Sequence, residues 1–208
     1  MLGPLRLGEA LGALAMGHVM FAGAGIINAA VQTPPRSPSP LASAPLATTA
    51  VAKVVTAMYS GAGIDGAALS DDATFTDPAA ACVGRAEVVE AFRALGACSP
   101  EHVAPPLAVS ERTVSTAGGT GDDGGPATGA VHVESEFFLH QRYFKGAYYS
   151  GLVVRSTLVV RADNAGRICA VEERWNGAPL LRFSAFRFAR RVNGMLSALL
   201  TPYVSRTG

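Results

Sequence analysis

Three runs of alternating apolar and polar residues occupy the second half of the chain, at 131–140, 148–161 and 167–175. Successive side chains of a strand point to opposite faces, so this alternation predicts strands that each bury one face. The sequence from Asp163 to Gly166 separates the last two runs and is typical of turns between antiparallel neighbours. The pattern therefore predicts a meander of long antiparallel strands.

The first half of the globular part has a helical pattern instead. Val51, Val54, Val55 and Met58 follow the spacing of a short amphipathic helix, and residues 86–95 predict a second helix that stops at Gly96. A short strand through Phe75 ends at Pro78, and a further strand is expected within 105–116. Helices that precede a meander of long antiparallel strands indicate an α+β fold.

An apolar extension precedes this domain. Ala10 to Val31 carries no charged residue, and a Pro- and Ser-rich stretch follows at 32–49. The run has about the length that crosses a hydrocarbon core, yet a cleaved targeting segment or a helix packed on the domain or a partner also fits. The predicted division is an anchor or targeting segment at 1–31, a linker at 32–49, the domain at 50–181 and a C-terminal tail at 182–208.

The tail mixes bulky apolar residues with arginines, and the chain has no acidic residue after Glu173. Such a segment suits an anionic membrane surface or an acidic groove of a partner, while a helix packed on its own domain is the alternative. Contact with a membrane or a protein complex is thus expected through residues 10–31 and 182–204. A membrane-associated or organellar location follows as the expectation.

Composition narrows the functional classes. The formal net charge is +1, so a general nucleic-acid binder, which needs a basic face, is not expected. The cysteines Cys82, Cys98 and Cys169 have neither a disulfide pattern nor metal-ligand spacing and predict buried apolar side chains. The glycine-rich stretch 117–130 lacks the Lys and the following helix of a phosphate-binding loop. No metal and no cofactor are predicted.

Two carboxylates are the leading candidates for acid/base chemistry. Glu173 shares a strand face with Val171 and Trp175, and a carboxylate on an apolar face must be paired or protonated. It is either an acid/base group or one half of an ion pair with Arg155 or Arg85. Asp77 stands beside Pro78 at the end of a strand, where it either acts as a general base or caps the following turn.

Aromatic and imidazole groups gather near the connection after the first long strand. His140, Tyr143 and Tyr148 could orient a carbonyl substrate, or they pack as ordinary aromatics at a sheet edge. Trp175 is expected either to fill the hollow of the bent sheet or to stack on a flat ligand. Trp175, Tyr148 and Phe75 are the predicted lining of a ligand pocket.

Two motifs resemble the nuclear transport factor 2-like superfamily, and within it the SnoaL-like branch. These are Leu69-Ser-Asp-Asp-Ala-Thr-Phe-Thr-Asp-Pro78 with Val83-Gly-Arg85, and the run from Glu173 to Leu180. The sequence is similar to a group of such domains from algae, plants and fungi over about residues 50–181. The resemblance implies a cone-shaped domain, in which a strongly bent antiparallel sheet wraps around the helices and leaves a pocket at its open end. It also implies an Asp or Glu as general acid or base, a Tyr, a His or a second acid that assists it, and a homodimer.

Two functional hypotheses follow. In the first, the chain is a non-catalytic or ligand-binding protein of this fold that holds a small apolar ligand and associates with a membrane or a larger complex. In the second, it is a metal-independent isomerase, cyclase or dehydratase that uses acid/base catalysis on a small apolar carbonyl substrate. Glu173 and Asp77 would be the acid/base pair, with Tyr143 or His140 as the donor to the oxyanion. A carboxylate in a cavity within hydrogen-bond reach of a Tyr or His favours the enzyme, whereas a hollow filled by aromatic side chains favours the scaffold.

Overall fold

The computed structural model describes residues 47–61, 63–115, 131–143, 152–176 and 184–204. The predicted anchor, most of the linker and the glycine-rich stretch lie outside these residues. The helices are α2 (Ala47–Met58), α3 (Arg85–Leu95) and α4 (Ser184–Val204), with short 3-10 turns η1 (Gly66–Ala68) and η2 (Gly96–Cys98). The strands are β1 (Leu69–Thr76), β2 (Ala81–Val83), β3 (Glu101–Ser115), β4 (Val131–Tyr143), β5 (Leu152–Ala162) and β6 (Ile168–Trp175).

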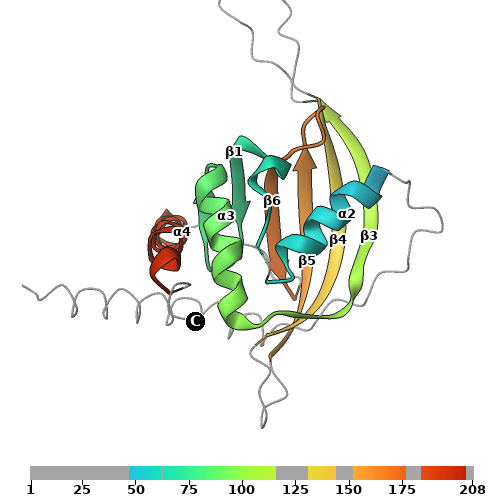
Figure 1. Cartoon of the computed structure of the whole chain (residues 1–208). Helices are drawn as coiled ribbons and strands as arrows, with labels where there is room; N and C mark the ends of the chain where they lie inside the picture. The colour runs from blue at the N-terminus through green and yellow to red at the C-terminus, as the bar shows by residue number, and fades with distance from the viewer. Residues whose placement is uncertain (1–46, 62, 116–130, 144–151, 177–183, 205–208) are drawn as a thin grey trace, which may run out of the picture.

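The strands form one sheet in the order β2-β1-β6-β5-β4-β3. Figure 1 shows this sheet bending around α2 and α3, which lie on its inner face. The α+β fold with a cone-shaped sheet is thereby confirmed. One detail differs from the prediction: β1 pairs with β6 in parallel, while the other neighbours are antiparallel. The chain reaches β6 only after crossing α3 and the whole meander, so β1 and β6 are not hairpin neighbours and can run in the same direction.

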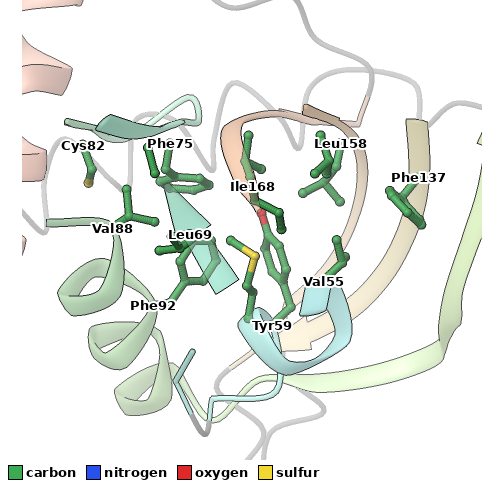
Figure 2. Close-up of a cluster of buried hydrophobic side chains, with 14 of the residues drawn as sticks. Val55, Tyr59, Leu69, Phe75, Cys82, Val88, Phe92, Phe137, Leu158 and Ile168 are labelled. Atoms are coloured by element: carbon green, nitrogen blue, oxygen red, sulfur yellow. The ribbon is translucent and has the colours of Figure 1, made fainter. Parts of the chain in front are cut away.

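The core fills the space between the inner sheet face and the two helices (Figure 2). Val55 and Met58 of α2 face the sheet, as their helical spacing predicts, and Val88 and Phe92 of α3 are buried beside them. Phe92 packs edge-on against Phe75 of β1, with ring centroids 4.8 Å apart. The sheet contributes alternate residues, of which Phe137, Leu139, Leu158, Val160, Ile168 and Val171 are buried.

Strand β3 begins earlier than the apolar pattern predicts, at Glu101 rather than near Pro105. It lies at the edge of the sheet and pairs only with β4, and the register shifts on both sides of Ala104. Proline cannot donate to a ladder but is tolerated on an edge strand or at an irregularity. The two prolines at 105 and 106 therefore interrupt the register without ending the strand.

The turn between β5 and β6 fixes the register that places Glu173. The carboxylate of Asp163 accepts hydrogen bonds from the backbone N–H groups of Ala165 and Arg167, and Gly166 has a φ of 76°. Glycine adopts this left-handed conformation without the steric penalty that other residues pay. Since a shift of one residue would turn every side chain of β6 to the other face, this short turn decides whether Glu173 points inward.

Helix α4 packs on its own domain, which was one of the two alternatives for the C-terminal segment. It lies beside α3 (Figure 1) and contacts β2. Arg191 forms a two-bonded ion pair with Glu87 of α3, at 2.6 and 2.8 Å. A Cβ atom at Gly194 would stand 2.3 Å from the carbonyl oxygen of Ala81, so only glycine permits this close approach.

The outer side of α4 exposes Phe188, Met195 and Leu199. Contact with a membrane or a complex through residues 182–204 stays a prediction. Among the helices that the structure describes, none combines the length and the apolar character needed to cross a bilayer.

Candidate functional site

A cavity of about 200 Å³ lies between the inner face of the sheet and the helices. Its walls come from both halves of the chain, including α3, β1, the ends of β4 to β6 and the inner side of α4. The described residues that line it are mostly apolar or aromatic, and the polar ones are Tyr59, Asp77, Cys98, Tyr143, Glu173, Trp175, Asn193 and Ser197.

Glu173 is the most deeply buried acid of the cavity, with an exposed fraction of 2%. The Tyr59 hydroxyl donates to its Oε2 at 2.8 Å, and the Ser156 hydroxyl donates to its Oε1 at 2.6 Å. The Trp175 indole N–H is a third donor. Burial raises the pKa of Glu173, and these three hydrogen bonds oppose the rise because they favour the ionised form.

The predicted alternative, an ion pair of Glu173 with Arg155 or Arg85, is wrong. Arg85 bonds Asp71 on the surface at 2.8 Å instead. Arg155 stands on the outer face of β5, because it alternates with the buried Val154 and Ser156. Glu173 is thus satisfied by neutral donors and not by a cation.

Asp77 lies in the turn after β1 and is buried, at 9% exposed. Its Oδ1 accepts hydrogen bonds from the backbone N–H groups of Ala79, at 2.6 Å, and of Ala80. Asp77 therefore caps the turn, as one of its alternatives proposed. Among the described residues no hydrogen bond is made to Oδ2, so this oxygen keeps its full capacity to bind a proton or a ligand.

The pKa of Asp77 is raised from its ordinary value of 3.8 to about 7. Burial is the largest cause, and the negative charge of Glu173 is the second. The amides of Ala80 and Ala79 and the cation of Arg190 act in the opposite direction. Because three donors favour the ionised form of Glu173 and the charge of Glu173 raises the pKa of Asp77, Asp77 is the acid of the pair that is protonated up to about neutral pH.

Helix α4 supports the turn that carries Asp77. Arg190 Nη1 donates to the main-chain oxygen of Asp77 at 3.4 Å, and Asn193 Nδ2 donates to the carbonyl oxygen of Ala79 at 2.8 Å. Asn193 also lines the cavity. The helix thus holds the turn from outside while its polar side chains close one wall of the site.

Tyr143 is the second tyrosine of the cavity. Its hydroxyl donates to Gln141 Oε1, and the amide of Gln141 donates in turn to the main-chain oxygen of Tyr59 at 3.0 Å. Burial and the charges of Glu173 and Asp77 raise the pKa of Tyr143 well above its ordinary value. The hydroxyl therefore remains a hydrogen-bond donor across the physiological pH range.

The structure places the remaining candidates differently from one another. Phe75 and Trp175 line the cavity. His140 does not belong to the lining, because it alternates along β4 with the buried Leu139 and Gln141 and so faces outward. Burial, followed by the nearby Arg155 and Arg142, lowers its pKa. Tyr148 lies outside the described residues.

Sequence reasoning missed Tyr59, Ser156 and Asn193. Ser156 gave a signal, since it is the polar residue on the otherwise apolar inward face of β5. Tyr59 follows α2 four residues after Val55 and therefore continues its buried stripe. Its partner Glu173 is 114 positions away, and no local pattern reveals such a pairing.

A strongly bent sheet with helices on its inner face and a cavity between them is the architecture that the resemblance of the sequence to the nuclear transport factor 2-like superfamily implies. No family model and no curated protein matches the chain. The algal, plant and fungal group to which the sequence is similar stays a prediction.

Solved structures that resemble the chain come from several bacteria. A candidate polyketide cyclase from Pseudomonas putida is 17% identical over 61% of this chain and 89% of its own, with a TM-score of 0.37. A candidate isomerase from Bacillus subtilis is 15% identical over 62% and 85%, with a TM-score of 0.39. A Catenulispora acidiphila protein with a ketosteroid isomerase-like fold, solved with trimethylamine, is 19% identical over 62% and 84%, with a TM-score of 0.35. At these identities and scores the matches carry nothing about function.

Proposed function

We propose that the cavity is the active site of an acid/base enzyme that moves a proton at the carbon next to a carbonyl group, as an isomerase, cyclase or dehydratase does. The proposal rests on the hydrogen bonds and the pKa of the Asp77 carboxyl group. Two backbone amides fix one of its carboxyl oxygens, and the other has no hydrogen bond among the described residues of a largely apolar cavity. A proton-transfer group works best when its pKa lies near the working pH, and that of Asp77 is about 7.

Asp77 is the group that takes and returns the proton. Near neutral pH a large fraction of its carboxyl groups is ionised, and Oδ2 is the oxygen available to accept a substrate proton. The negative charge that develops on the carbonyl oxygen needs a donor. Tyr143 serves in this role by turning its hydroxyl from Gln141 to the substrate.

Glu173 acts through Asp77 and is a positioning residue. The donors Tyr59, Ser156 and Trp175 hold it in place, and its charge disfavours a second charge on Asp77. Without this neighbour, Asp77 would lose its proton at a lower pH and would be a weaker base. Pairs of carboxyl groups divided in this way between two roles are a recurring basis of acid/base catalysis.

The lining indicates the kind of substrate. Phe75, Phe92, Leu95, Leu152 and Val154 provide apolar contact, and the volume of about 200 Å³ limits the substrate to a small molecule. A small apolar compound with one carbonyl group fits these walls. A non-catalytic scaffold was expected to have its hollow filled by aromatic side chains, and the cavity argues against that form of the first hypothesis. A non-catalytic protein that binds a small apolar ligand would share the cavity, and an exchange experiment separates it from the enzyme.

Exchange of hydrogen for deuterium next to a carbonyl tests the proposal without knowledge of the natural substrate. A panel of small cyclic ketones and keto esters is incubated with the protein in deuterated buffer and followed by proton NMR. We expect exchange faster than in buffer alone for some members of the panel, with a rate that rises as pH passes through about 7. Asp77→Asn should reduce that rate by about two to four orders of magnitude.

Asp72→Asn is the matched control, because Asp72 lies on β1, the strand that precedes Asp77, with its side chain exposed. Its exchange rate should equal that of the wild type. Exchange no faster than in buffer for every compound, or full activity in Asp77→Asn, would refute the proposed function.

A further inference from the structure

The cavity combines an aromatic lining with buried negative charge. Tyr59, Phe75, Phe92, Tyr143 and Trp175 all contribute to its walls, together with the two carboxyl groups of Asp77 and Glu173. Among the described residues that line it there is no Lys, Arg or His. Arg190 contacts the main-chain oxygen of Asp77 and is not part of the lining.

No cation lies among the described residues that line the cavity, although the charge of Arg190, outside the lining, lowers the pKa of Asp77. Glu173 is satisfied by neutral hydrogen-bond donors, and Asp77 Oδ2 accepts no hydrogen bond among the described residues. Ionised groups that are removed from water are costly unless an opposite charge accompanies them. A cation inside the cavity would relieve this cost and would also meet the negative faces that aromatic rings present.

We propose that the cavity binds a small alkylammonium ion, held by the carboxylates of Glu173 and Asp77 and enclosed by aromatic side chains. A trimethylammonium group fits a volume of about 200 Å³. Its methyl groups contact apolar walls, and its charge needs no direct hydrogen bond, which suits a site where most donors are already engaged. The proposal uses the same cavity as the proposed function but does not depend on proton transfer there.

Binding of such an ion depends on pH, because Asp77 must lose its proton to contribute charge. The pKa of about 7 in the empty cavity means that affinity rises as pH increases through neutrality. The other charged or titratable groups that face Asp77 from the surrounding elements are Tyr59, Cys82, Tyr143, Glu173 and Arg190. The pKa values of Tyr59, Tyr143 and Cys82 are all raised, the last to about 12, so these groups stay neutral in this range.

Choline and its neutral isostere, the dimethylbutanol in which carbon replaces the ammonium nitrogen, form a matched pair of probes. Trp175 is the single tryptophan of the chain and lines the cavity, so its fluorescence reports binding directly. We expect choline to bind about tenfold or more tightly than the isostere at about pH 8 and constant ionic strength. The affinity for choline should be lower at about pH 6, while the affinity for the isostere should stay the same because the isostere carries no charge.

Glu173→Gln and Asp77→Asn should each reduce the affinity for choline while the affinity for the isostere is retained, and Asp72→Asn should change neither. Equal affinities of the two probes for the wild type, or a preference that is independent of pH, would overturn the proposal without recourse to any variant. Choline binding with no deuterium exchange would refute only the proposed function. Exchange without a preference for choline would refute only the ammonium site.

Discussion

Replacement of Asp77 by Asn should stabilise the protein at neutral and alkaline pH, although the residue belongs to the candidate site. Asn has the same shape and keeps an oxygen that can accept the hydrogen bonds from the amides of Ala79 and Ala80. It removes the charge that burial and Glu173 disfavour. The variant therefore separates the cost of the charge from the geometry of the turn.

The size of the effect follows from the pKa. An acid whose pKa rises on folding binds its proton more tightly in the native state, so the native state loses stability as pH increases between the two values. For Asp77 these values are 3.8 and about 7, and each pH unit corresponds to about 1.4 kcal/mol. The full loss is therefore roughly 4 kcal/mol, and about 2.5 kcal/mol of it falls between about pH 5 and pH 8.

Urea unfolding followed by Trp175 fluorescence measures this difference. The free energies of unfolding of wild type and Asp77→Asn should agree within about 1 kcal/mol at about pH 4, which is close to the unfolded-state pKa of 3.8, so that little of the loss has accumulated. The free energy of unfolding of the variant should exceed that of the wild type by an amount that grows as pH rises and reaches a plateau above about pH 8. Asp72→Asn is again the control, because it removes an exposed carboxyl group from the strand that precedes the turn at Asp77.

A constant difference between wild type and Asp77→Asn over this pH range would refute the reasoning. It would mean that Asp77 is ionised at its ordinary pH in the native state, so that burial and Glu173 do not act on it as argued. A difference that grows in the opposite direction would indicate that the ionised form is the stabilised one. Either result would also remove the main support for Asp77 as a proton-transfer group near neutral pH.

Three further predictions concern other parts of the fold. Gly194→Ala should lower the free energy of unfolding by about 1–3 kcal/mol, and the thermal unfolding temperature with it, because the new Cβ would meet the Ala81 carbonyl oxygen at 2.3 Å. Tyr59→Phe should cost about 1–3 kcal/mol in urea unfolding at neutral pH, since it removes a donor from buried Glu173, and less at low pH, where that acid is protonated. Glu134→Gln should lower the free energy of unfolding by no more than about 1 kcal/mol at neutral pH, because the two arginines that bind the carboxylate are largely exposed. This loss should vanish under acid conditions, since those arginines lower the pKa of Glu134 and so stabilise only its ionised form.

Local patterns in the sequence were sufficient for the parts of the site that depend on alternation. The period of two in β6 placed Glu173 on the inner face with Val171 and Trp175, and the turn at Asp163 fixed that register. The same rule, applied strictly to β4, turns His140 outward and Tyr143 inward. His140 is close to Tyr143 in the sequence, but proximity along a strand does not mean a shared face.

The parts that depend on long-range contacts could not be predicted in this way. The parallel pairing of β1 with β6 joins strands from opposite ends of the domain, and hydrophobic alternation does not specify a strand's partner. The packing of α4 on its own domain could not be predicted for a similar reason. Its apolar and basic composition suited either a membrane surface or the domain itself, and the choice depended on partners such as Glu87 of α3 and the turn at Ala79.

One side of helix α4 contacts the candidate site, and the other side is exposed. The inner side carries Arg190 and Asn193, which bind the main chain of the turn at Asp77, so a displacement of the helix would alter both the walls of the cavity and the environment of the buried acid. The outer side exposes Phe188 and Met195. Since the charge of Arg190 lowers the pKa of Asp77, removing that charge from the turn would raise the pH at which Asp77 ionises. The position of α4 is therefore coupled to the proton affinity of the candidate site.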